Sequence, residues 1–579
     1  MKTAAFFFTL NFLLSGFISA QQTYVPDNNF EHYLETHDAA GHTVPVGDAS
    51  SMGNGVDYDD YVLTSRINSV TKLNVASQNI ADLTGIADFL NLRILYCDDN
   101  QLSSLDLSGN TALQEIHSQD NQLTELILPQ TTHLKIINCE NNQLTNLNIT
   151  HNTALQNVYC SNNQITQLDI TQNIALQGLT CSNNLLTTLD VGQNTNLVGL
   201  SCENNQLNDL DITQNTLLES LDCGINHLSQ LNLTQNIHLV YLYCYNNQLT
   251  NLDLSHNANL KFIDCSSNQL TSLNLLNNSV LETLFCGNNQ LTQIDFPPHP
   301  VLQALFCNNN QLTDLTLPQN STLQSIDCHG NQLSTLNVIN CSALRSLWCS
   351  NNQLTTLDIS QNSLLRFLTC DNNQITNLEV TQNSNLGELT CYNNQLTNLD
   401  LTQNNTLFNL TCYNNQLTSL DMSHNPDLIT LDCKNNHLTQ LDLRNGQNIH
   451  LVGFDTTSNP DLTCVFVDDK VYMTNHWPNA IDSSAHYVET QAECDALHLD
   501  ENFEALIKVY PNPFRNYLNI EVPDKTRIKT ISLENIQGQR LYQTEFLPSI
   551  DLNNLTAGFY YLSIESQSGQ QAVFKLVKE

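Results

Sequence analysis

Apolar and polar positions recur with a fixed period of 21 residues along most of the chain. Cysteine occupies 16 of the 17 positions on a grid from Cys97 to Cys433, and Ser118 occupies the other. An asparagine follows three residues after every grid position, as Asn394 follows Cys391. The surrounding pattern LxxLxCxxNxL places leucine and cysteine on one side of a short extended segment. It predicts one short strand per repeat, with its apolar side in a core.

The second half of each repeat has a similar pattern, LxxLxLxxN, as in residues 396–404. Each repeat therefore consists of two half-repeats. This nested pattern resembles the 21-residue class of bacterial leucine-rich repeats. The resemblance implies an all-β-dominated fold, a solenoid over residues 70–462 with two parallel sheets and little helix. Each coil buries little surface by itself, so stacking supplies the stability. We expect the repeated asparagine to point inward and to bond the backbone of neighbouring coils.

The grid cysteines have two interpretations, a metal or redox array and a buried apolar column. None has a CxxC partner or a histidine at zinc-finger spacing. Side chains in register on adjacent parallel strands point the same way, which suits a disulfide poorly. Because free cysteine behaves as a small buried hydrophobe, we predict a core column. Cys341 lies off the grid and replaces a loop asparagine.

The ends of the solenoid need caps, because terminal coils otherwise expose apolar edges. Residues 21–69 are polar and non-repetitive, and we interpret them as an N-terminal cap with a short helix at 30–35. Residues 463–500 are interpreted as a C-terminal cap in which Trp477 covers the final coil. Cys464 and Cys494 flank this segment and are expected to form a structural disulfide.

The repeat stops before residues 508–579, which follow a linker at 501–507. This tail holds eight basic and seven acidic residues, and its alternating segments predict a small β-sandwich of six or seven strands. It resembles the C-terminal sorting domain of the type IX secretion system found in Bacteroidetes-type bacteria. The matching positions are Tyr510, Pro511, Asn512, Pro513, Gly538, Gly558, Tyr560 and Lys575. The resemblance implies a partnership with that secretion machinery, transport across the outer membrane and removal of the tail.

The N-terminus carries a second export signal. Residues 1–20 begin with Lys2, continue with an apolar run and close on Ile18-Ser19-Ala20. This layout is typical of a cleaved signal peptide, and an uncleaved anchor is the alternative. We therefore expect the mature protein at the outer cell surface or outside the cell, after removal of the signal peptide and the tail.

Charge and motifs restrict the function further. The net charge is −38 with 13% charged residues, whereas a nucleic-acid-binding protein needs a basic surface. The same balance disfavours an anionic membrane surface as a partner. The sequence contains no GxSxG elbow, HExxH motif or phosphate-binding glycine loop. We expect a protein that is not an enzyme.

Aromatic residues gather at outward positions of the cysteine-bearing strands. They lie three residues before, one before or one after the grid cysteine, mostly in neighbouring coils. We predict a ligand-binding face from Tyr241, Tyr243, Tyr245, Phe262, Phe285, Phe306, Trp348, Phe367, Tyr392 and Tyr413. The alternative is that aromatic residues simply favour strands and cover their neighbours.

The other half-repeat carries a column of acidic residues at its outward position. Stacked carboxylates lie about 5 Å apart and repel one another by roughly 1 kcal/mol per pair in water. One interpretation is a soluble acidic face without a cofactor. The other is Ca²⁺ bridging, since this ion prefers carboxylate and amide oxygens. The candidate ligands are Asp358, Glu379, Asp400 and Asp421.

Two functions remain compatible with these features. The first is an exported binding protein, adhesin-like, which recognises a protein or glycan partner. The alternative is a structural component of the cell-surface layer without a specific soluble ligand.

Overall fold

The computed structural model describes residues 21–296, 301–317, 322–500, 503–522, 528–567 and 569–579, so the expected signal peptide at 1–20 lies outside the described residues. The chain forms two compact units, Met1–Asn394 and Gln395–Glu579, which are described separately. None of the helices in the described ranges is long and apolar enough to cross a membrane.

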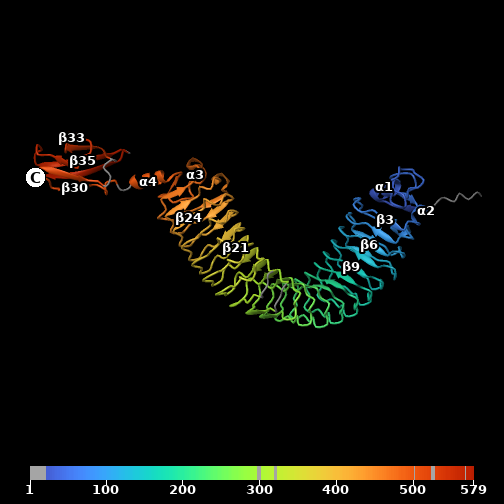
Figure 1. Cartoon of the computed structure of the whole chain (residues 1–579). Helices are drawn as coiled ribbons and strands as arrows, with labels where there is room; N and C mark the ends of the chain where they lie inside the picture. Colours follow the sequence, from blue (N-terminus) through green and yellow to red (C-terminus); the bar gives the residue numbers. More distant parts are fainter. Residues whose placement is uncertain (1–20, 297–300, 318–321, 501–502, 523–527, 568) are drawn as a thin grey trace, which may run out of the picture. The chain divides into compact units, whose positions relative to one another are not determined.

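The first unit is a stack of coils joined by parallel three-residue strands (Figure 1). Successive strands pair in register, so Leu242 of one coil faces Ile263 of the next. A grid cysteine directly follows each strand except β3 (Lys72–Asn74), which is followed by Val75, and β6 (Glu115–His117), which is followed by Ser118. The strands are β3 (Lys72–Asn74), β4 (Ile94–Tyr96), β6 (Glu115–His117), β8 (Ile136–Asn138), β9 (Asn157–Tyr159), β10 (Gly178–Thr180), β11 (Gly199–Ser201), β12 (Ser220–Asp222), β13 (Tyr241–Tyr243), β14 (Phe262–Asp264), β16 (Thr283–Phe285), β18 (Ala304–Phe306), β19 (Ser325–Asp327), β20 (Ser346–Trp348), β21 (Phe367–Thr369) and β22 (Glu388–Thr390).

The second half-repeats form strands only in places. In the first unit β5 (Ser104–Asp106) pairs with β7 (Glu125–Ile127), and β15 (Ser272–Asn274) pairs with β17 (Gln293–Asp295). The described second half-repeats between residues 128 and 271 form no strand. The expected parallel solenoid is confirmed, and its second sheet is shorter than the first. In those coils the outward Asp or Asn binds the backbone of its own turn, as Asp211 accepts from Thr213 N.

The core is built from buried leucine, cysteine and asparagine. Leu242 and Cys244 of one coil are fully buried. Asn247 donates from Nδ2 to Cys223 O at 3.0 Å and accepts at Oδ1 from Leu228 N at 2.9 Å. Asn246 before it has φ +52°, a left-handed conformation that asparagine tolerates better than most residues. Asn246 thus forms the turn, and Asn247 links its own coil to the preceding one through hydrogen bonds.

The N-terminal segment folds into a small cap. Its strands β1 (Gln22–Tyr24) and β2 (Tyr61–Leu63) pair antiparallel. The helix expected at 30–35 is α1 (Asn28–Thr36), which begins after Asp27 because the Asp27 carboxylate accepts from Asn29 N and Phe30 N. The remaining helices are α2 (Thr64–Ile67) and the 3₁₀ helix η1 (Ile86–Asp88).

The second unit begins with further coils. Its first sheet contains β23 (Asn409–Thr411), β25 (Thr430–Asp432) and β27 (Gly453–Asp455). Its second sheet contains β24 (Ser419–Asp421), β26 (Gln440–Asp442), β28 (Cys464–Phe466) and β29 (His486–Val488). Helices are η2 (Asn448–His450), α3 (Lys470–His476) and α4 (Gln491–Asp500). Trp477, just after α3, packs edge-on against Phe454 of β27.

In its described residues, the tail is a sandwich of two antiparallel sheets with seven strands, as the sequence predicts. One sheet contains β30 (Lys508–Tyr510), β31 (Tyr517–Glu521) and β34 (Ser549–Asp551). The other contains β33 (Arg540–Thr544), β32 (Ile528–Asn535), β35 (Gly558–Ser566) and β36 (Gln571–Lys578). Phe514, Leu518, Ile531, Leu562 and Leu576 are buried between them.

Candidate ligand-binding face

The outward residues at the ends of strands β12 to β20 form one column across seven coils. Their backbones pair in register from each coil to the next. The column contains Asp222, Tyr243, Asp264, Phe285, Phe306, Asp327 and Trp348. We call this column, with its neighbours Tyr241, Phe262, Tyr245 and Glu203, the aromatic face.

Five rings of the aromatic face form a continuous chain of contacts. Ring centroids are 4.8 Å apart for Tyr243 and Phe262, and 5.6 Å apart for Phe262 and Phe285. Phe285 and Phe306 stack at 4.5 Å, and Phe306 stacks with Trp348 at 6.5 Å. All five side chains are partly exposed. The rings therefore cover one another and still present an apolar strip to solvent.

Carboxylates border this strip at its N-terminal end. Burial raises the pKa of Asp222 to about 6, and the nearby carboxylates of Glu203 and Asp264 act in the same direction, although Gly224 N donates to Asp222. The Tyr245 hydroxyl donates to Glu203. Burial and this hydrogen bond raise the pKa of Tyr245. Sequence analysis missed these acids, although Asp222 and Asp264 occupy the same outward column as Tyr243.

The other predicted face residues have different surroundings. Tyr241 is 46% exposed. The Arg366 guanidinium lies 5.4 Å from the centre of the Phe367 ring. Tyr392 is partly exposed. Tyr413 belongs to the second unit, where the Lys434 ammonium lies 5.1 Å from its ring centre.

The acidic column on the second half-repeats has a local structural role. Asp358 accepts from Ser360 N at 3.0 Å, Glu379 from Thr381 N at 3.1 Å, and Asp400 from Thr402 N at 3.0 Å. Asp421 likewise accepts from Ser423 N. The backbone hydrogen bonds, first among the causes, lower the pKa of Asp358 and Asp400. Within the described ranges, no group of three or more His, Cys, Asp or Glu is arranged to hold a metal ion.

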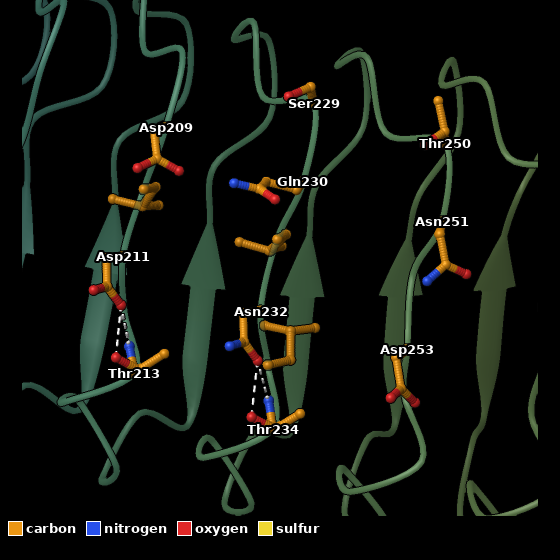
Figure 2. A pocket seen from close by; sticks show the side chains of 13 residues that line it. Asp209, Asp211, Thr213, Ser229, Gln230, Asn232, Thr234, Thr250, Asn251 and Asp253 are labelled. Atoms are coloured by element: carbon orange, nitrogen blue, oxygen red, sulfur yellow. Dashed lines mark hydrogen bonds between the residues drawn. The ribbon is translucent and has the colours of Figure 1, made fainter.

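A polar depression of about 520 Å³ lies on the surface of the second half-repeats, in the coils around residues 209–253. Figure 2 shows Asp209, Asp211, Gln230, Asn232 and Asp253 projecting from successive coils. Asp211 and Asn232 each accept from the threonine two residues later. Carboxylate, amide and hydroxyl groups line the depression, and the local turns occupy part of their hydrogen-bonding capacity.

The free cysteines are buried, as a core column requires. Burial raises the pKa of the Cys139 thiol to about 12, so this sulfur is protonated at neutral pH. Cys341 is also buried, and Asn362 Nδ2 donates to its carbonyl. Cys464 and Cys494 form a disulfide with their Cα atoms 5.8 Å apart.

The sorting-motif residues hold the tail together. Asn512 Nδ2 donates to Lys575 O at 2.8 Å, and Val577 N donates to Asn512 Oδ1 at 2.9 Å, which ties the YPNP segment to the last strand. The flanking Tyr510–Pro511 and Asn512–Pro513 bonds are cis. Gly538 has φ +78° in the turn between β32 and β33. Gly558 begins β35, and the Tyr560 hydroxyl donates to Thr556 O at 2.7 Å.

Comparison with protein-family models identifies the C-terminal part of the chain. Residues 508–579 match the family model described as a secretion system C-terminal sorting domain, so the tail is a type IX sorting domain. No curated protein sequence matches this chain.

Solved structures with a similar fold come from bacteria and plants. The functional domain of InlJ from Listeria monocytogenes, which includes a cysteine ladder, is 25% identical over 97% of this chain and 99% of its own, with a TM-score of 0.48. A leucine-rich-repeat protein of Leptospira interrogans is 27% identical over 58% and 93%, with a TM-score of 0.49. The Arabidopsis receptor kinase HAESA leucine-rich-repeat ectodomain, in complex with an IDA peptide hormone ligand, is 19% identical over 72% and 76%, with a TM-score of 0.54. The similarity to the HAESA ectodomain shows that the solenoid has the leucine-rich-repeat fold.

Proposed function

We propose that this chain is an exported leucine-rich-repeat binding protein that recognises an external protein or glycan through its aromatic face. The sorting tail directs the chain into type IX secretion, to the cell surface or beyond it. The observation that supports binding is the chain of five contacting, partly exposed rings from Tyr243 to Trp348. Aromatic side chains contribute large contact areas at interfaces and are enriched among residues that dominate binding energy.

The position of the rings favours this function over simple strand cover. A buried apolar surface stabilises a fold, whereas these rings lie on the outer side of the sheet opposite the leucine and cysteine core. The fold presents such residues at a regular spacing on a long surface, which suits a ligand that extends across several coils. The HAESA ectodomain, with the same fold, binds a peptide hormone.

The test replaces Tyr243, Phe306 and Trp348 together by alanine in the full chain. A screen of immobilised glycans and extracellular proteins first identifies a partner for the unaltered protein, and titration then measures its affinity. We expect the triple variant to lose at least tenfold in affinity, since removing one buried aromatic anchor costs about 2 kcal/mol or more.

The matched control is Tyr159→Ala. Tyr159 lies at the same outward strand position as Tyr243, four coils earlier in the chain. This control should leave affinity unchanged. Circular dichroism must show the same melting curve for both variants. Full affinity in a folded triple variant would contradict binding through this face and would favour the alternative, a structural component of the cell-surface layer.

A further inference from the structure

Acidic and aromatic residues are interspersed along the outward column of the aromatic face. From β12 to β20 the outward column is Asp, Tyr, Asp, Phe, Phe, Asp, Trp. Each acid is paired in register with an aromatic residue of an adjacent coil, as Asp222 and Asp264 are with Tyr243. Aromatic rings attract cations through their faces, and carboxylates attract them by charge. A cationic group over this column therefore contacts a ring and a carboxylate at once.

The protein supplies few cations of its own to these acids. Within the described residues, no ion pair joins Lys, Arg or His to Asp222, Asp264 or Glu203. Asp264 instead accepts from Ser266, through both its N and its Oγ. Asp327, further along the column, pairs with its own His329 at 2.7 Å. The N-terminal end of the face thus carries negative charge that no basic side chain balances.

We propose, on the basis of the function proposed above, that this column binds an extended segment of a partner polypeptide that carries arginine or lysine residues. The aromatic rings receive the aliphatic stems and the charged heads of those side chains. Asp222, Asp264 and Asp327 select for positive charge.

The coil spacing restricts the ligand. Adjacent parallel strands lie about 4.8 Å apart, so Asp222 and Asp264 are separated by about 10 Å, and Asp264 and Asp327 by about 14 Å. An extended polypeptide advances about 3.3 Å per residue. Side chains of an extended chain alternate between its two sides, so basic residues that all face the column lie an even number of positions apart. Basic residues at every fourth position, about 13 Å apart, match the three acids within the reach of a flexible arginine or lysine side chain.

Charge also distinguishes a basic peptide from a neutral glycan. A ligand that covers Asp222 removes water from a carboxylate that is already poorly solvated, and burial of an unpaired charge is costly. A cation compensates that cost, whereas a neutral sugar supplies hydrogen bonds without charge. The chain as a whole, at −38, adds a long-range attraction for basic partners.

The experiment uses the purified full chain and a labelled twelve-residue probe. The probe carries three arginines spaced four positions apart in a glycine, serine and threonine background, and two matched probes carry glutamine or glutamate instead. Fluorescence anisotropy measures affinity at several salt concentrations. We expect binding of the arginine probe, weakening as salt rises, and at least a tenfold weaker affinity for the glutamine and glutamate probes.

The variant pair is Asp222→Asn with Asp264→Asn, and its matched control is Asp211→Asn with Asp253→Asn. The control makes the same charge change in nearby coils, on the other half-repeat. Asparagine is already present at the equivalent position in Asn232, where it keeps the turn hydrogen bonds. We expect at least a tenfold loss of arginine-probe affinity in the first pair and no more than a twofold loss in the control.

Several results would overturn the inference. These are absence of arginine-probe binding, equal affinity for the glutamine probe, and equal losses in both pairs. If a glycan partner loses affinity in the Tyr243, Phe306 and Trp348 variant but not in Asp222→Asn with Asp264→Asn, this inference fails and the proposed function stands. If the triple aromatic variant keeps full affinity for every partner found, both fail. Melting curves establish that each variant is folded.

Discussion

The two half-repeats of each coil have similar lengths and nearly the same pattern, yet they differ in their outward surfaces. In the first half-repeat, the column from Asp222 to Trp348 changes from acid to aromatic between coils. In the second, the outward residue is mostly Asp or Asn, and it binds its own turn, as in Asp211 and Asn232. The second half-repeats are uniform because every coil needs an outward Asp or Asn to bond the backbone of its turn. Variation on the other side indicates that these side chains are not required for stacking.

The two buried asparagine columns differ in a related way. Asn247 of the first half-repeat uses Nδ2 and Oδ1 to bond neighbouring backbone. Asn257 of the second donates to Leu233 O at 3.1 Å and Asn236 O at 2.9 Å, but its Oδ1 is buried without a hydrogen bond. The first column therefore saturates its amide, and the second does not. We expect the first half-repeat to contribute more to the cohesion between coils.

The largest expected effect tests that difference. Asn247→Ala leaves Leu228 N without a partner and removes one of the donors to each of three carbonyls. We therefore expect a loss of about 2–4 kcal/mol, whereas Asn257→Ala should cost about 1–2 kcal/mol. Urea unfolding, followed by circular dichroism, measures both under one set of conditions. Equal losses would show that the two columns are equivalent despite their different hydrogen bonds.

A smaller effect concerns the core residues of one coil. Cys244 fills the first half-repeat where Leu254 fills the second, and both are buried. Cys244→Leu adds volume to a column of stacked small side chains, and overpacking of this kind costs about 1–3 kcal/mol. Cys244→Ala, the control, should cost about 1 kcal/mol. A Cys244→Leu protein as stable as the unaltered one would show that the column has room, and that small size is not the reason for cysteine.

The next prediction compares two carboxylates on opposite faces. Burial raises the pKa of Asp222 to about 6, so its contribution to stability is present at low pH and is lost as pH rises from about 4 through 6. Hydrogen bonds from Thr213 lower the pKa of Asp211, so its contribution is present at neutral pH and is lost on acidification.

Thermal unfolding of Asp222→Asn and Asp211→Asn from pH 4 to pH 8 measures this contrast. Asp222→Asn should be more stable than the unaltered protein at pH 7.5, by at most about 1 kcal/mol because the group is partly screened by solvent, and the gap should close near pH 4. Asp211→Asn should be less stable at pH 7.5, with the gap also closing in acid. Shifts of the same sign in both variants would contradict the difference between the faces.

The sequence predicts the repetitive parts of this molecule better than its site. The repeated Cys and Asn predict coils stacked in register. In that arrangement every coil has the same conformation, and the asparagine of each coil bonds the same backbone groups of its neighbour. The aromatic residues of the face could be predicted from the sequence, because Tyr243, Phe285 and Trp348 occupy outward positions of the repeat. Their contacts were not, because ring separations depend on side-chain rotamers that a repeat pattern does not determine. The acids of the face were missed because an isolated Asp222 has no distinctive motif until its burial and neighbours are known.

The smallest expected effect concerns calcium on the second half-repeats. Bridging of Asp358 and Glu379 by Ca²⁺, the alternative to a soluble acidic face, competes with the hydrogen bond that each carboxylate already accepts from its own turn, so we expect at most weak binding. A site with a millimolar dissociation constant raises the melting temperature by about 1 °C at 1 mM Ca²⁺. The measurement compares CaCl₂ with NaCl at matched ionic strength, and Asp358→Asn with Glu379→Gln should abolish the shift. An unchanged melting temperature in CaCl₂ would exclude calcium bridging and leave this face with its local role in the turns, in contrast to the charged column from Asp222 to Trp348.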